Sequence, residues 1–478
     1  MPLGSCLTRQ QKLTWIGWAF VLILSAFALR YFSQSFTRDV QIVDMPIATF
    51  VALYCAVAIV FVILIPVLIR GATGDSVGLL FLILLAGLMA RLMLFGTPAI
   101  LEDDYNRYLW DGAVTANGIN PYQYSPQQIA NGEVDNAMLY KLKTQSGEIF
   151  QRINYPEFST VYPPAAQMVF ALVYWISPFN LDALRLVLLI FEAGSVALIL
   201  AILKHIQLSP LWVTLYWWNP LIIKEAGNSV HMEPLLMFPV LLACFLLLKG
   251  KTMLSSAALA VAAGVKVWPI LLVIPIWRQL LSSPKRLIAN GFVFGLVLAV
   301  MITPVLYAEL NDHSGFGAFA SQWQASSAAY LIAESIANWV WPYEWDAVVD
   351  VTKIARFLLV LTLLFFIGAV SFKSAANWAM VMKRMFLITA AIYLLSPSNT
   401  PWYFIWIAPF LCFFPVKGLM LAGALIPLHY LFFHFNVRGQ GEIYHDLIIW
   451  LIWLPVWGLL ITDKWKDFYY RRLEVRGS

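Results

Sequence analysis

Long apolar stretches recur along the whole chain, separated by short polar segments. Each runs for about 20 residues, the length of helix that crosses the hydrocarbon core of a bilayer. Lys and Arg gather at alternate boundaries and mark the cytoplasmic side. The pattern predicts full spans at 13–31, 46–69, 77–95, 183–203, 209–227, 232–249, 288–306, 353–372, 385–397, 402–416, 418–435 and 443–462.

Two further apolar stretches disturb this alternation. One, Val161 to Ile176, opens with two prolines, and the other, Ser255 to Trp277, contains Gly264, Lys266 and Pro269. If both crossed the membrane, several basic loops would move to the wrong side. The charge pattern therefore predicts about 12 crossings, two partially inserted segments and cytoplasmic N- and C-termini. Non-helical backbone at membrane depth needs cover from protein or a wet cavity, so interrupted segments point toward a site.

Composition strengthens this prediction of an all-α polytopic membrane protein, with residues 1–478 forming one integral membrane domain. Of the 478 residues, 61% are hydrophobic and only 12% charged, whereas soluble domains carry about 25% charge. Soluble enzymes, nucleic-acid partners and disordered scaffolds are excluded. Three of the four cysteines lie in apolar runs and none forms a C-x-x-C pair, which argues against a disulfide framework or a zinc site.

The strongest candidate chemistry lies in the first large outer loop, 96–160, while 307–352 forms a second outer loop that resembles a lid or lateral wall. Asp103 and Asp104 suit the first turn of an amphipathic helix, where carboxylates meet exposed N–H groups. Asp104, Arg107, Tyr108 and Asp111 then follow at a spacing that places them on one helical face. This face suits a general base with sugar-binding neighbours, or else a capped interfacial helix with an Arg–Asp pair.

Two outer turns carry further polar residues. His231 and Glu233 follow Asn219-Pro220 and are spaced to face one cavity, or to form a capping turn that faces water. Two ligands at this spacing are weak evidence for a metal. Tyr403, in Ser396-Pro-Ser-Asn-Thr-Pro-Trp-Tyr403, is a candidate substrate contact or a member of an interfacial aromatic belt.

Buried cations form a third group of candidates. Arg91, Lys224 and Lys266 are costly at membrane depth and are candidates for contact with a lipid phosphate, although each has the option of pairing internally or snorkelling. The chain has no Walker loop and no dinucleotide-binding G-x-G-x-x-G. An activated group used on the outer face would therefore arrive on a lipid.

At this point the pattern resembles the GT-C membrane glycosyltransferases. The resemblance rests on an acidic pair in the first outer loop, on Tyr162-Pro-Pro164 before an apolar helix, and on Asn219-Pro220 followed by Gly-Asn-x-x-His-x-Glu. Within that superfamily, Glu102-Asp-Asp-Tyr-x-Arg-Tyr-x-Trp-Asp-Gly112 with Gly118-Ile-Asn-Pro-Tyr122 is most similar to bacterial polyprenol-phosphate-mannose-dependent mannosyltransferases. The chain departs from some members in placing the acidic loop after its third span rather than its first.

The resemblance implies an enzyme of the bacterial cytoplasmic (inner) membrane with its active site on the periplasmic face. It would transfer a hexose, preferably mannose, from a polyprenyl-phosphate carrier to a lipid, glycan or protein hydroxyl with inversion. Asp103 or Asp104 would be the general base, with Asp103 slightly favoured. No cofactor is required, and a divalent metal is not expected, although the acidic pair has the chemistry to bind one. A transporter or flippase of a lipid-linked sugar is the alternative.

Overall fold

The computed structural model describes residues 8–37, 39–72, 76–308, 315, 323–340 and 350–462, and the regular elements within these ranges are all helices. The basic tail from Lys464 onward and residues 309–314, 316–322 and 341–349 of the 307–352 loop, expected to act as a lid, lie outside the described residues. The weakly apolar segment at 328–341, predicted to lie on the outer side, contains helix α17 (Ala328–Val340).

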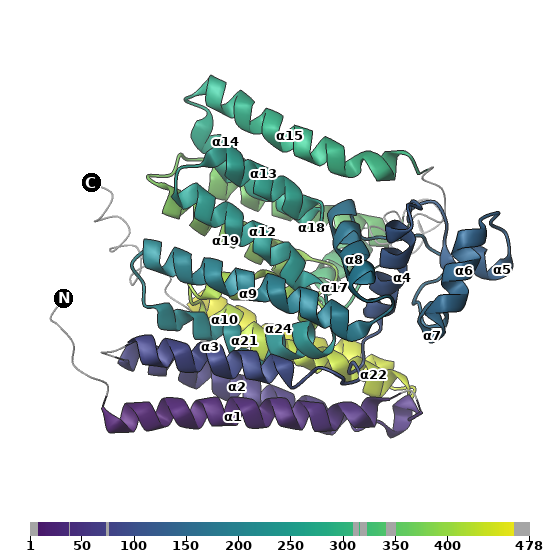
Figure 1. Cartoon of the computed structure of the whole chain (residues 1–478). Coiled ribbons are helices and arrows are strands. Elements are labelled where there is room, and N and C mark those ends of the chain that lie inside the picture. The colour runs from purple at the N-terminus through teal and green to yellow at the C-terminus, as the bar shows by residue number, and fades with distance from the viewer. Residues whose placement is uncertain are drawn as a thin grey trace. The chain divides into compact units, whose positions relative to one another are not determined.

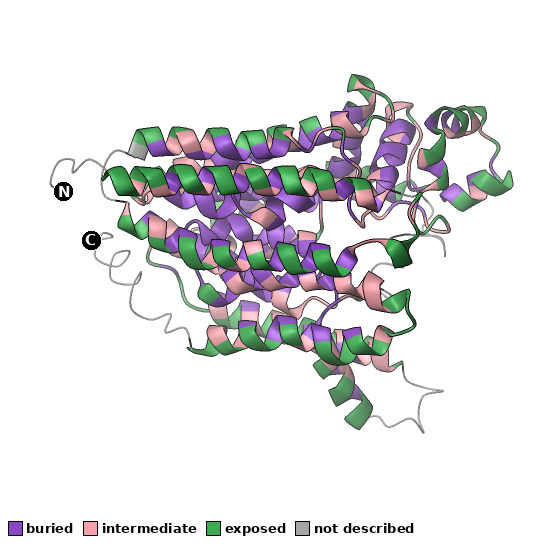
Figure 2. Cartoon of the chain, turned by 90° about the horizontal axis from the view of Figure 1, so that it is seen from below, coloured by how far each residue is buried: buried purple, intermediate pink, exposed green. Residues whose placement is uncertain are grey.

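Within the described ranges, eight helices have the length and hydropathy to cross a membrane. This confirms the expectation of a polytopic helical membrane protein at the level of its long apolar helices. Large apolar side chains are exposed along these helices, such as Phe20 and Phe27 of α1 (Arg9–Ser33) at 68% and 55%. Figure 2 shows exposed residues repeating along the lengths of the helices. The eight are Arg9–Phe36, Ile47–Gly71, Leu181–His205, Pro284–Leu306, Val351–Ser371, Trp378–Leu395, Lys417–Asn436 and Gly441–Thr462.

Two of the expected spans are not continuous helices. The 209–227 stretch is divided by Asn219, whose side chain accepts a hydrogen bond from the backbone N–H of Leu221 and starts a new helix at Pro220. The 402–416 stretch is also divided into short helices. A 3₁₀ helix begins at Pro401, and the α-helix Ala408–Leu411 has Pro409 as its second residue. Proline lacks the N–H that a continuing helix needs, so both stretches break.

The first of the two predicted partial insertions forms a single short helix and the second is broken, and their insertion into a membrane stays a prediction. Pro164 starts the 13-residue helix α8 (Pro164–Ile176). The second segment forms α13 (Thr252–Ala263), a 3₁₀ turn at Trp268–Leu272 and α14 (Val273–Leu280), with Lys266 between the first two.

The chain forms two compact units, each made of segments that are far apart in the sequence. Unit 1 comprises Met1–Ile100, Val196–Asn228 and Gln324–Ser478, and unit 2 comprises Leu101–Ser195 and Ser229–Trp323. Helix α9 (Leu181–His205) is shared by the two units, because the division falls between Ser195 and Val196.

Unit 2 contains the helices of the 96–160 loop and further helices of 8 to 23 residues. Helix α4 (Asp104–Ala116) packs along α8, and the two lie side by side in Figure 1. Gly112 makes this approach close, because a Cβ there would lie 2.3 Å from the carbonyl oxygen of Phe170. The other helices of this unit are α5 (Pro126–Asn131), α6 (Ala137–Ser146), α7 (Glu148–Gln151), α12 (Glu233–Leu248), α13, α14 and α15 (Pro284–Leu306).

Unit 1 is built mainly from long apolar helices. Helix α1 packs on α3 (Ser76–Leu92), and α2 (Ile47–Gly71) packs on α21 (Lys417–Leu425). Helix α21 also packs on α24 (Ile449–Thr462). A π-helical turn at Ile223–Asn228 carries the buried Lys224 and Glu225. Its helices are α1 (Arg9–Ser33), α2 (Ile47–Gly71), α3 (Ser76–Leu92), α10 (Thr214–Trp217), α11 (Pro220–Ile222), α17, α18 (Val351–Ser371), α19 (Trp378–Leu395), α20 (Ala408–Leu411), α21 (Lys417–Leu425), α22 (Leu431–Asn436), α23 (Gly441–Ile443) and α24 (Ile449–Thr462).

Candidate functional site

The start of α4 carries three successive carboxylates in unit 2. Asp103 is the residue before the helix and Asp104 is its first residue, so the expected helix begins where the sequence predicts it. The Asp103 side chain makes no capping bond to the helix backbone. Asp103 is exposed, whereas the Glu102 side chain is only 8% exposed. The positive end of the helix favours negative charge at these positions.

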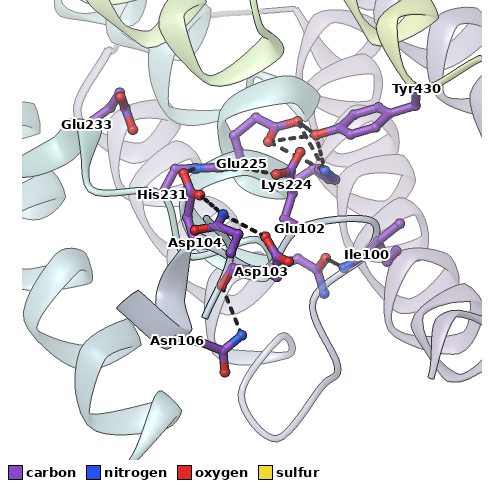
Figure 3. Close-up of polar contacts among 12 residues, drawn as sticks. Ile100, Glu102, Asp103, Asp104, Asn106, Lys224, Glu225, His231, Glu233 and Tyr430 are labelled. Atoms are coloured by element: carbon purple, nitrogen blue, oxygen red, sulfur yellow. Dashed lines mark hydrogen bonds and ion pairs between the residues drawn. The ribbon is translucent and has the colours of Figure 1, made fainter. Parts of the chain in front are cut away.

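His231 lies between two of these carboxylates. Its Nε2 is 3.4 Å from the carboxylate of Glu102 and its Nδ1 is 3.8 Å from that of Asp104. Figure 3 shows the imidazole beside the acidic run, and the ring is fully buried. When the ring is protonated, its positive charge lies within ion-pair distance of both carboxylates. The structure thus brings His231, from the turn after Asn219-Pro220, beside the acidic run at the start of α4.

Asn154 ties the acidic pair to a distant part of the first outer loop. Its side-chain amide nitrogen donates to Asp103 Oδ1 at 3.0 Å and to Asp104 Oδ1 at 2.8 Å. Both carboxylates therefore keep a fixed orientation. Sequence reasoning missed Asn154, because no spacing pattern connects a single Asn to carboxylates about fifty positions earlier.

Arg107 binds the backbone of a loop about fifty positions later in the chain. Its guanidinium donates to the carbonyl oxygens of Asn154 (3.0 Å), Tyr155 (2.9 Å) and Phe158 (3.2 Å), and the residue is 5% exposed. A planar donor fork suits several acceptors at once. Arg107 thus holds the loop that carries Asn154, and its expected contact with substrate stays a prediction.

Tyr108 connects the acidic pair with a second ionic group. Its hydroxyl donates to Asp104 Oδ2 at 3.5 Å. Burial raises the pKa of Tyr108, and Tyr162, Asp104 and Glu233 raise it further, so the phenol stays a neutral donor at neutral pH. Glu233 in turn accepts a hydrogen bond from Lys266 Nζ at 2.6 Å. Lys266, expected to contact a lipid phosphate, is therefore the partner of a buried carboxylate.

Asp111 faces inward rather than toward an open cavity. Gln167 of α8 donates to its Oδ2 at 3.2 Å, and the residue is 2% exposed. Burial raises the pKa of Asp111, an effect that Arg107, Thr160 and Gln167 oppose. This environment makes Asp111 a tie between α4 and α8, and its expected contact with a sugar stays a prediction.

Two of the other predicted cations lie in unit 1. Arg91 is 2% exposed, donates to the carbonyl oxygens of Gly87 and Trp217 at 2.9 Å, and stacks on the Trp217 ring. Lys224 is fully buried, contacts the Tyr430 hydroxyl and lies 3.3 Å from Glu225, as Figure 3 shows. Both charges are therefore paired inside the protein, the internal alternative that the sequence left open.

Lys224 also lines an apolar pocket of unit 1. The pocket has a volume of about 250 Å³ and lies between α1 and α2. Its walls are mainly side chains such as Leu22, Leu29 and Phe61, and Lys224 is the charged residue among them. A pocket of this composition suits an apolar group.

Tyr403 does not stand at an open surface. It is 7% exposed and stacks on Trp406, with ring centroids 4.2 Å apart, in the 3₁₀ helix Pro401–Trp406 of unit 1. This packing gives the ring a structural role, and its expected contact with substrate stays a prediction.

Comparisons with protein families, with curated proteins and with solved structures found no match for this chain. The class that the long apolar helices define is a polytopic helical membrane protein.

Proposed function

We propose that the chain is a membrane glycosyltransferase. It moves a hexose, mannose by resemblance, from a polyprenyl-phosphate carrier to a hydroxyl acceptor on the outer face of a bacterial inner membrane. The observation that carries this proposal is the cluster at the start of α4, where three carboxylates meet a buried imidazole and the amide of Asn154. Clusters of titratable groups around a helix terminus are typical of sites that move protons.

In this mechanism a carboxylate takes the proton of the acceptor hydroxyl as the oxygen attacks the anomeric carbon. The bond to the carrier phosphate breaks on the opposite side, and the configuration inverts. We assign the base to Asp103, because it is the more exposed of the pair. Asp104, held by Asn154 and Tyr108, would orient the base and the sugar. A positioned base of this kind contributes roughly 10²–10⁴-fold to the rate.

The neighbouring donors and acceptors suit the hydroxyls of a sugar. His231 and Tyr108 can donate to sugar oxygens, and Glu233 can accept from them. The leaving phosphate is already an anion and needs a cation or dipole rather than a proton. Arg91, Lys224 and Lys266 stay the predicted contacts for that phosphate.

The proposal is tested by replacing each carboxylate with its amide. Purified Asp103→Asn and Asp104→Asn proteins are supplied with radiolabelled polyprenyl-phosphate mannose and a mixture of hydroxyl acceptors. We expect transfer by at least one variant to fall by roughly 10²–10⁴-fold, with the helical circular dichroism spectrum unchanged. Asp135→Asn, in an exposed acid of the same loop, is the control and should retain activity. Full turnover by both test variants would refute the assignment.

The same labelled donor separates the alternative function. A transporter or flippase in sealed vesicles would move the lipid-linked sugar across the bilayer with its sugar–phosphate bond intact. Chelation with EDTA is a second arm, and transfer should continue because the proposed base and leaving group need no metal.

A further inference from the structure

An exposed aromatic pair stands beside the acidic cluster of unit 2. Tyr155 is 51% exposed and Trp323 is half-buried. Their ring centroids lie 4.4 Å apart, and the ring planes are tilted by 58°. The two rings therefore form an angled corner, although they are more than a hundred and sixty positions apart in the chain.

The backbone at Tyr155 adopts a conformation that an aromatic residue rarely takes. Its φ is +47°, in the left-handed region, which costs about 1–2 kcal/mol for a residue with a side chain. Arg107 holds this conformation, because its guanidinium binds the carbonyl oxygens of both Asn154 and Tyr155. Strain of this kind persists where the surroundings over-determine it, and it often accompanies a functional position.

The same loop joins the aromatic pair to the carboxylates. Asn154, the preceding residue, donates to both Asp103 and Asp104. Partial burial raises the pKa of the Tyr155 phenol, and the nearby charges of Asp103 and Asp104 raise it further. An apolar ring surface and two hydrogen-bond acceptors thus lie next to each other.

This combination matches the chemistry of a pyranose. One face of a pyranose consists of C–H groups, which pack on the electron-rich face of an aromatic ring. Its rim consists of hydroxyls, which donate to carboxylates. A protein side-chain hydroxyl or a simple lipid alcohol has no such flat apolar face. The corner therefore favours a sugar over the other two acceptor classes.

We propose that Tyr155 and Trp323 bind the pyranose ring of the acceptor, so that the hydroxyl which attacks belongs to a glycan. This inference rests on the proposed function, because it places the acceptor hydroxyl beside Asp103 and Asp104. In this arrangement Tyr155 contacts the acceptor and contributes to acceptor specificity, while Asp103 is the base.

The first experiment measures transfer from polyprenyl-phosphate mannose to mannobiose or maltose with purified full-length protein. We expect Tyr155→Ala to raise the KM for the disaccharide by about tenfold, the effect of losing one aromatic contact of roughly 1.4 kcal/mol. The KM for the donor should stay unchanged, because Tyr155 contacts the acceptor in this proposal. Tyr155→Phe keeps the ring and should restore the KM, and Trp175→Ala, in an exposed aromatic residue of α8, is the control.

The second experiment needs no turnover. Saturation-transfer NMR detects binding of either disaccharide to the protein, and we expect the signal to fall in Tyr155→Ala and in Trp323→Ala. If the wild type transfers no mannose but binds the disaccharide, and this binding depends on Tyr155, the proposed function is refuted and the sugar site is retained. An unchanged KM and unchanged binding in the alanine variants would overturn the inference. So would a Tyr155→Phe protein whose KM and binding signal change as much as those of Tyr155→Ala.

Discussion

Asp111 illustrates how a single residue on the polar face of a helix acquires a structural role. In the sequence it continues the series of polar positions that starts at Asp104. In the structure it is 2% exposed, and its partners are Gln167 and the charge of Arg107. A carboxylate in this position keeps its hydrogen bonds but bears the cost of desolvation when it is ionised.

This cost gives stability a pH dependence that can be measured. Because the folded pKa lies above the ordinary value of 3.8, the folded state binds the proton more tightly than the unfolded state. The stabilising contribution is full below pH 3.8 and is lost as the pH rises through the folded pKa. Asp111→Asn keeps an acceptor oxygen for Gln167 and removes the charge. We expect its midpoint temperature in detergent to equal or exceed that of the wild type at neutral pH, with the difference shrinking toward acidic pH.

A lower midpoint for Asp111→Asn than for the wild type at every pH would contradict this explanation. Asp135→Asn, which removes an exposed charge from the same loop, is the matched control and should leave the pH profile unchanged.

At the scale of elements, the position of the site depends on the contact between α4 and α8. Gly112 allows the two helices to approach each other. The rings of Tyr108 and Phe170 stack nearly parallel, with their centroids 4.8 Å apart. On the opposite side, Trp110 and Ala113 pack with Leu139 of α6 in the core of the outer loop. The acidic pair is thus attached to a helix that is fixed on two sides.

Two glycine substitutions test this packing. Gly112→Ala would place a methyl group against the backbone of Phe170, which cannot rotate away, so we expect a loss of about 1–3 kcal/mol and reduced transfer. Gly291→Ala in α15 meets nothing within 4 Å and should be neutral or stabilising by up to about 1 kcal/mol. Thermal unfolding of both proteins in one detergent measures the difference, and equal stability would show that the close approach is not needed.

At the scale of the whole molecule, function depends on which side of the membrane carries the acidic loop. The long apolar helices fit a multi-pass protein, and the basic boundaries predict that 96–160 faces outward. The proposal needs this orientation, because a carrier-borne sugar on the outer face must meet the carboxylates.

Single cysteines test the orientation. Cys55, Cys244 and Cys412 are buried, so after Cys6→Ser a new surface cysteine should dominate labelling. We expect Glu133→Cys, an exposed position in the outer loop, to react with a membrane-impermeant maleimide on intact cells. Lys251→Cys, exposed at a predicted cytoplasmic boundary, should react only after permeabilisation. The reverse pattern would place the acidic loop in the cytoplasm and end the proposal.

The sequence by itself determined the class of protein, the long apolar helices and the start of α4 at the acidic pair. These features follow from local patterns: the length of an apolar run, proline positions and helical spacing. Hydropathy did not reveal that 209–227 and 402–416 are broken, because buried core and lipid-facing segments are equally apolar.

Only the tertiary structure decided which groups meet. It placed His231 between Glu102 and Asp104, paired Lys266 with Glu233, and turned Arg107 toward loop carbonyls. Such contacts join residues that are distant in the chain, and they depend on how helices pack rather than on spacing within any one segment. The aromatic corner at Tyr155 has the same origin, since its two rings come from separate segments of unit 2.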